Sequence, residues 1–174
     1  MLRIIIQLLK RRLRVDSRVK LYMERSENEL RLAKAVFNLS DDDETKIRLD
    51  ANPDDTFYSA AISHAYYAIF YSAKSLLLTK NIDTKSPEIH KKTFEEFKRN
   101  FVETGILDIN LLQIYRKMIV KADELLGLFS QEKWKRGHFT YHTISQANIE
   151  PAKESVSNSK RFIANIKEVI KRFY

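Results

Sequence analysis

Apolar residues recur at helical spacing in five stretches of this chain. In the first two stretches, the residues that share one helical face are Met23, Leu30, Ala33 and Phe37, then Ile62, Ala65, Tyr66, Ile69, Ala73 and Leu76. The other three stretches begin near residues 86, 108 and 151, and no stretch alternates apolar with polar residues. The pattern predicts an all-α protein: an antiparallel, up-and-down four-helix bundle core with an additional helix or arm.

Polar and helix-breaking residues predict where these helices begin and end. Residues 38–55 are rich in Asp and Asn and contain Pro53, so we expect a loop there. Ser86 and Asp108 are suited to cap the third and fourth helices, with Pro87 at the first helical position of the third. Gly105 is expected to end the third helix.

The second helical stretch, residues 54–81, is apolar nearly all round. Tyr67, Phe70 and Tyr71 cover much of the surface that the main apolar stripe leaves open. A helix of this kind must be buried on more than one side. In a chain of 174 residues, we expect one side to face the bundle core and another to face a second subunit, which predicts a homodimer.

Charge separates the start of the chain from the rest. The formal net charge is +8, and residues 1–20 hold seven Lys and Arg residues against the single acid Asp16. We therefore expect a basic N-terminal arm or helix over residues 1–19 and a helical domain over residues 20–174. Such an arm attracts phosphates or acidic surfaces. Its apolar run is too short to span a bilayer, so a partner subunit or nucleic acid is favoured over a membrane surface.

Composition excludes several kinds of chemistry. The chain has no Cys, which excludes disulfides, thiolate metal sites and cysteine nucleophiles. It has three Gly and no glycine-rich phosphate loop. His138 and His142 are four positions apart but lack a nearby carboxylate ligand, so we expect no metal and no cofactor. A cytoplasmic location is expected.

The segment "EKWKRGHFTYHTISQ" carries the candidate chemistry. Its Arg can hold phosphate oxygens with a planar fork, and its His can transfer protons near neutral pH. A basic loop that caps the last helix remains an alternative interpretation. The candidate residues here are Lys133, Lys135, Arg136, His138, Tyr141 and His142.

The runs "SHAYYAIFYSAKSLLL" and "IHKKTFEEFKRNFVETGILD", with the Arg-containing segment that follows, resemble the HEPN family over residues 20–172. They are most similar to an uncharacterised prokaryotic subfamily. The resemblance implies a four-helix core, usually a homodimer. Many members are metal-independent ribonucleases, including toxins, whose signature is Arg, four to six residues, then His. Arg136, five residues and His142 fit that signature.

Under this resemblance, Arg136 and His142 are the catalytic candidates for cleaving single-stranded RNA. Lys133, Lys135, His138 and Tyr141 are expected to contact RNA or a nucleotide, and His64 could line the cleft or be a satisfied interior group. On a continuous helix, Arg136 and His142 would be about 600° apart in rotation and would point in different directions. They can therefore meet only in a bent segment or across a dimer.

A second interpretation is a non-catalytic HEPN protein that binds a nucleotide or partners a small nucleotidyltransferase. Gly137 stands where active members carry a polar residue, and related proteins of the subfamily lack the His. In some toxins of the family, a partner nucleotidyltransferase modifies a Tyr close to the His, which makes Tyr141 a candidate for modification. A third interpretation is a helical interaction module whose N-terminal arm docks on another protein or a membrane.

Overall fold

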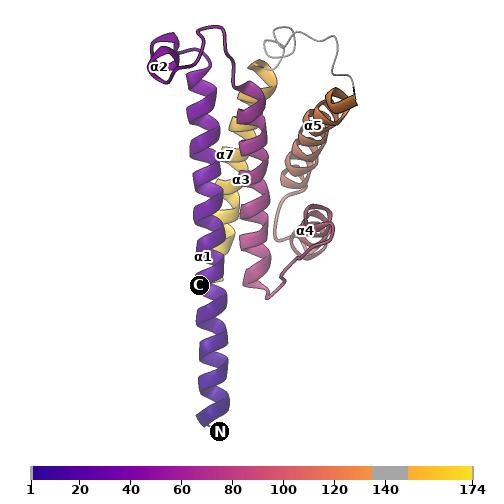
Figure 1. The fold of residues 1–174 in the computed structure, drawn as a ribbon. Helices are drawn as coiled ribbons and strands as arrows, with labels where there is room; N and C mark the ends of the chain where they lie inside the picture. The colour runs from indigo at the N-terminus through magenta and orange to yellow at the C-terminus, as the bar shows by residue number, and fades with distance from the viewer. Residues whose placement is uncertain (1, 135–148, 174) are drawn as a thin grey trace.

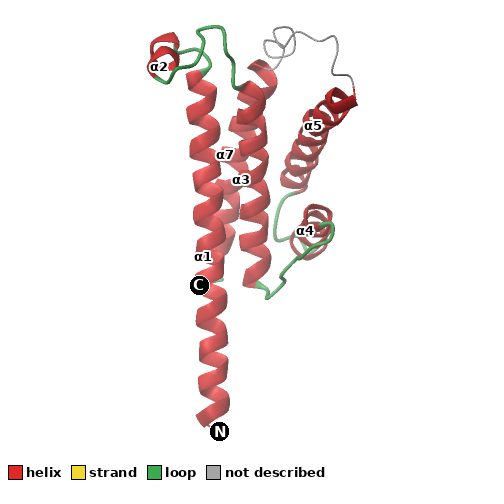
Figure 2. Cartoon of the chain, viewed as in Figure 1, coloured by secondary structure: helices red, strands yellow, loops and turns green. Residues whose placement is uncertain are grey.

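The structure, a computed structural model, describes residues 2–134 and 149–173 as helices joined by loops and turns (Figures 1 and 2). No strand occurs in these two ranges. The all-α prediction is therefore confirmed. The elements are α1 (Leu2–Leu39), α2 (Asp43–Arg48), α3 (Tyr58–Thr79), α4 (Ile89–Phe97), a π-helical turn (Lys98–Val102), α5 (Ile109–Trp134) and α7 (Ile149–Lys171).

The four long helices run up and down, with α3 at the centre (Figure 1). Helix α1 lies along one side of α3, α7 lies behind both, and α4 and α5 cover the other side. Apolar side chains from α3, α4, the π-helical turn, α5 and α7 fill the space between the helices. The largest fully buried side chains include Ile69, Phe97, Phe101, Tyr115 and Phe162.

The burial of α3 within one chain accounts for its apolar surface. Ala61, Leu76 and Leu77 are fully buried in the core, and Ala68, also fully buried, lies against Ser26 of α1. Tyr67 is the large apolar residue of α3 that stays exposed, at 38%. Helices α1, α4, α5 and α7 of the same chain cover most of α3, so its apolar pattern does not by itself require a second subunit. The homodimer stays a prediction.

Two serine hydroxyls join α1 to α3. Ser26 Oγ donates to the Ala68 carbonyl at 2.6 Å, and Ser75 Oγ donates to the Val19 carbonyl at 2.7 Å. Both serines are fully buried. Small side chains allow the two helices to approach closely, and the hydrogen bonds satisfy hydroxyls that would be costly to bury alone.

The expected helix ends are confirmed in part. Asp108 directly precedes α5, and its Oδ1 accepts from the Asn110 amide at 2.7 Å. Ser86 and Pro87 were wrong as the start of the third helix, because α4 begins at Ile89 after Glu88, which has left-handed backbone angles (φ 58°). Gly105, at φ 73°, lies three residues beyond the π-helical turn.

The segment expected to be a loop contains the short helix α2. Asp42 caps it: its side chain accepts from the Thr45 amide at 3.0 Å and from the Thr45 hydroxyl at 2.6 Å. These bonds favour the carboxylate form and lower the pKa of Asp42. The Asp residues that predicted a loop thus include the residue that begins a helix.

Helix α1 passes residues 19 and 20, the expected domain boundary, without a break, and its N-terminal part projects beyond the bundle (Figure 1). Over the described part of the chain, none of the helices combines the length and apolarity that crossing a membrane requires.

Candidate functional site

The helix ends that flank the segment with the candidate chemistry lie at the same end of the bundle. Helix α5 ends at Trp134 and α7 begins at Ile149, both at the end where α1 finishes and α3 begins (Figure 1). Arg136, His142, Lys135, His138 and Tyr141 lie outside the described residues. Lys133 belongs to the last turn of α5, and its side chain also lies outside them.

His64 is the predicted site residue that the structure describes fully. Its Nδ1 lies 2.7 Å from Oε2 of Glu29 on α1. A carboxylate oxygen accepts hydrogen bonds, so the imidazole Nδ1–H is suited to be the donor in this pair. The His64 side chain is 32% exposed and that of Glu29 is 24% exposed. His64 is thus part-buried, with its Nδ1 satisfied by Glu29, and a role in lining an RNA cleft stays a prediction.

His90 has surroundings that sequence reasoning missed. On α4, its ring stacks on Phe70 with centroids 4.2 Å apart. Its Nδ1 also lies 2.8 Å from the Tyr66 hydroxyl. The signal was present in the sequence, because His90 stands four positions before Phe94 and eleven before Phe101, which are both buried.

A row of aromatic rings connects α1, α3 and α4. Tyr22 stacks on Tyr71 at 6.1 Å between centroids, and Tyr71 stacks on Tyr67 at 6.2 Å. Tyr67 then meets the His90 ring edge-on at 6.1 Å. The Arg25 guanidinium lies 4.5 Å from the Tyr71 ring centroid and donates to the Tyr71 hydroxyl at 3.1 Å.

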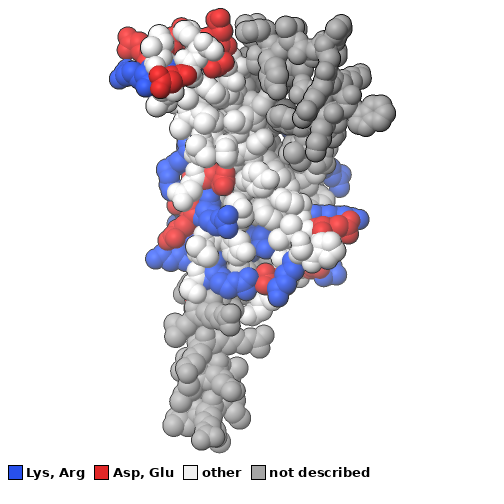
Figure 3. Space-filling model, in the orientation of Figure 1, with Lys and Arg blue, Asp and Glu red and all other residues white. Residues whose placement is uncertain are grey.

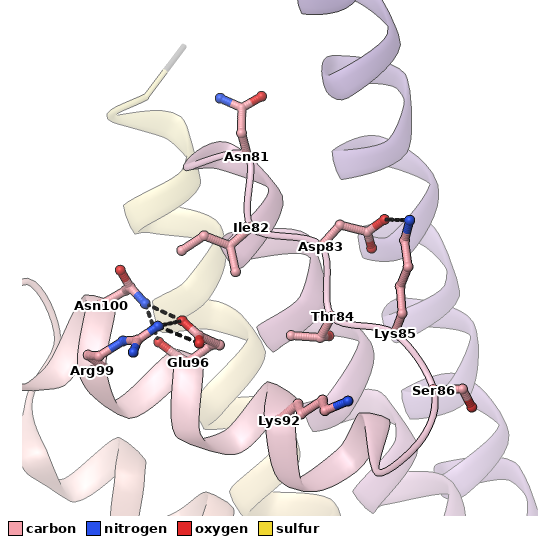
Figure 4. Close-up of a pocket in the computed structure, with 10 residues that line it drawn as sticks. All are labelled: Asn81, Ile82, Asp83, Thr84, Lys85, Ser86, Lys92, Glu96, Arg99 and Asn100. Atoms are coloured by element: carbon pink, nitrogen blue, oxygen red, sulfur yellow. Dashed lines mark hydrogen bonds and ion pairs between the residues drawn. The ribbon is translucent and has the colours of Figure 1, made fainter.

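A polar hollow of about 730 Å³ lies between the α3–α4 connection and the π-helical turn (Figure 4). Its charged groups are largely paired with one another. Glu96 binds Arg99, and it accepts from Asn100 Nδ2 at 2.9 Å. Asp83 lies 3.8 Å from Lys85 and also pairs with Arg18 at 3.0 Å. This internal pairing is typical of a structural connection between helices.

Opposite charges gather at different parts of the surface. Exposed acids crowd the end that carries α2, whereas Lys and Arg side chains predominate lower on the bundle in Figure 3. The only lysine within α2, Lys46, is buried and binds the Pro53 carbonyl. The exposed acids of this end are Asp41, Asp42, Asp43, Glu44, Asp50, Asp54 and Asp55.

Metal-ligating side chains do not gather in the described parts of the chain. Within residues 2–134 and 149–173, no group of three or more His, Asp and Glu residues is placed to hold a metal ion. The two histidines that suggested a metal pair from their spacing, His138 and His142, lie outside these ranges.

The protein is an all-α bundle with an aromatic helix at its centre. A basic segment precedes its last helix. The HEPN domain family matches residues 43–170. That match spans more than half of the chain, so the chain belongs to the HEPN family, as the sequence motifs indicated.

Archaeal relatives support the same assignment. The chain is 32% identical over 114 residues to "Putative toxin MJ0605" of Methanocaldococcus jannaschii, which covers 66% of this chain and 72% of the relative. It is 40% identical over 57 residues to "Putative toxin MJ0142" of the same organism, covering 33% of this chain and 37% of the relative.

A third relative carries no functional name. The chain is 35% identical over 72 residues to a UPF0332 protein of Pyrococcus horikoshii, covering 40% of this chain and 46% of that protein. The chain thus spans nearly three quarters of the first relative and less than half of the other two.

Proposed function

We propose that this protein is a toxin-type, metal-independent endoribonuclease that acts as a homodimer on single-stranded RNA. The observation that carries the proposal is the Arg136–His142 spacing directly before the last helix, in a HEPN chain whose relatives include two proteins named as toxins. The proposed target is single-stranded RNA in the cytoplasm, and the proposed chemistry requires no cofactor.

The proposed reaction is an internal transesterification. The RNA 2′-hydroxyl loses its proton to one His142 imidazole and attacks the adjacent phosphorus. The bond from phosphorus to the 5′-oxygen breaks, and that oxygen takes a proton from a second His142 imidazolium. Arg136 holds the phosphate oxygens as negative charge builds on them. The products are a 2′,3′-cyclic phosphate and a 5′-hydroxyl.

A homodimer would supply both pairs of groups. Two copies bring two Arg136 and two His142 side chains to one site around the two-fold axis. On one continuous helix the two positions would be about 600° apart in rotation, so Arg136 and His142 can meet only in a bent segment or across a dimer, and the proposal adopts the dimer. Lys133, Lys135 and His138 would hold neighbouring phosphates, and the basic arm would attract the RNA chain.

Cleavage of labelled single-stranded RNA in EDTA tests the proposal. Wild type should cut and leave a cyclic phosphate, whereas His142→Ala and Arg136→Ala should leave the RNA intact. Lys160→Ala, on an exposed face of α7, is the matched control and should cut like wild type. RNA left intact by wild type, or cut equally by all four proteins, would contradict the proposal.

A second candidate function follows from Gly137, which occupies the place of a polar residue in active members. In this case the protein binds a nucleotide, or serves a small nucleotidyltransferase that modifies Tyr141. Co-expression with such an enzyme, followed by mass spectrometry of the peptide that contains Tyr141, tests it. An added nucleotide mass on Tyr141 supports the partnership, and an unmodified peptide contradicts it.

A further inference from the structure

A cleft of about 470 Å³ opens between α3, α4 and α5, away from the acidic end at α2. Its volume lies within the range of small-ligand sites in proteins. The residues that line it are Tyr66, Tyr67, His90, Lys91, Phe94, Arg116, Ile119, Val120 and Ala122. Most of its lining is aromatic or aliphatic, with polar groups at a few positions.

Tyr67 offers this cleft an aromatic ring that the bundle core does not use. It is 38% exposed, whereas its neighbours Tyr66 and Phe70 are 8% and 4% exposed. Contacts with Tyr71 and His90, at 6.2 and 6.1 Å between centroids, hold the ring on two sides. On α5, the aliphatic side chains of Ile119 and Val120 line the same cleft, and Val120 is 51% exposed.

The positive charge of the lining favours an anionic ligand. Lys91 and Arg116 are cations, and none of the described residues that line the cleft is a carboxylate. Lys91 lies 3.6 Å from Glu88, which is outside the lining and 62% exposed. The Arg116 guanidinium lies 5.9 Å from the Phe94 ring centroid, so an aromatic ring rather than a carboxylate faces it there.

We propose that this cleft binds one unpaired nucleobase, stacked on Tyr67, with the attached phosphate held by Arg116 and Lys91. Every base has a face that can stack on an aromatic ring, and the two cations match the phosphate. The base belongs to the single-stranded RNA of the proposed function, on which this inference rests. A free nucleotide has the same chemistry and is separated from RNA by the experiment below.

The position of the cleft on α5 suits a subsite for RNA that is cut by Arg136 and His142, which follow α5 in the sequence. Helix α5 continues from Ala122 to Trp134, about 18 Å of helix axis, and residues 135–148 follow. An RNA strand that occupies the cleft can therefore extend along α5 toward Arg136. The exposed acids of α2 lie beside the end of α1 and would repel phosphate there (Figures 1 and 3).

Fluorescence anisotropy with a labelled single-stranded RNA tests the subsite. All proteins carry His142→Ala, so that the RNA stays intact during the measurement. Tyr67→Leu and Arg116→Gln should each weaken binding about tenfold, the effect of losing one stacked base or one phosphate contact. Tyr67→Phe keeps the ring and should bind like the parent. Lys160→Gln removes one positive charge from exposed α7 surface and is the matched control for Arg116→Gln.

Each outcome bears on a separate claim. Equal RNA binding by the parent, Tyr67→Leu and Arg116→Gln would overturn the subsite, while cleavage by wild type in EDTA would still support the proposed function. If wild type does not cleave RNA in EDTA, the proposed function is overturned, whatever the binding results. Adenosine 5′-monophosphate binding that depends on Tyr67, with no RNA binding by the parent, would overturn RNA as the source and assign the cleft to a free nucleotide.

Discussion

Glu29 on α1 and His64 on α3 form a carboxylate–imidazole pair across the helix interface, with Oε2 2.7 Å from Nδ1. Both side chains are partly exposed, so solvent screens their interaction. We expect Glu29→Gln and His64→Ala each to lower the free energy of unfolding by less than about 1 kcal/mol. A double-mutant cycle in urea should give a coupling of about 0.5 kcal/mol. Strictly additive effects would show that the pair contributes nothing to stability.

Lys74 should contribute more to stability than Arg18, although both contact Asp83. Lys74 Nζ donates to the Thr84 carbonyl at 2.9 Å and lies 5.0 Å from the Tyr22 ring centroid, and its side chain is 5% exposed. Arg18 is 37% exposed. Urea denaturation should show a loss of about 3 kcal/mol for Lys74→Ala and less than about 1 kcal/mol for Arg18→Ala. Equal losses would contradict this ranking.

The Tyr58 hydroxyl should make stability depend on alkaline pH. Burial is the main cause that raises the pKa of Tyr58 to about 12, and the hydrogen bond to Asp41 at 2.6 Å is the second. The folded protein then holds this proton more tightly than the unfolded chain, whose Tyr pKa is about 10. The contribution is present below pH 10 and is lost as the pH rises from about 10 to 12. Unfolding in urea across this range should show a shallower decline for Tyr58→Phe than for wild type.

The hydroxyl of Tyr115 costs stability in the core. The side chain is fully buried, and its oxygen finds no hydrogen-bond partner among the residues that the structure describes. Burial also raises the pKa of this hydroxyl well above its ordinary value. Tyr115→Phe keeps the ring against Phe97 and Phe162, so it should raise the free energy of unfolding by about 1 kcal/mol. A lower melting temperature for this variant would contradict the expectation.

Hydrophobic spacing was sufficient to predict the bundle, because burying apolar stripes at helical spacing has few solutions in a chain this long. It could not predict which neighbours cover each face. Tyr67 and Phe70 both looked like contacts for a second subunit, yet Phe70 is buried beneath His90 of the same chain. The choice between a neighbouring helix and a second copy depends on tertiary packing, which local spacing does not encode.

Local sequence signals predicted some helix ends correctly and missed others. Asp108 was recognisable as a cap because its side chain binds an amide two residues away. The start of α4 was missed because Glu88 adopts left-handed angles that its residue type does not favour. Arg136 and His142 were found through the resemblance to a family signature and lie outside the described residues, so their roles remain predictions.

Helix α1 shows that the segment matched by the family and the segment that packs as one bundle are different units. The family match begins at residue 43, after α1 has ended, yet Val19, Ser26 and Ala33 of α1 are buried against the bundle. A protein truncated to the family match would lack α1, the longest helix that packs on α3. Ala61, Ala68 and Ser75 of α3 would then be exposed to water. The burial of α3 therefore depends on a helix that lies outside the family match.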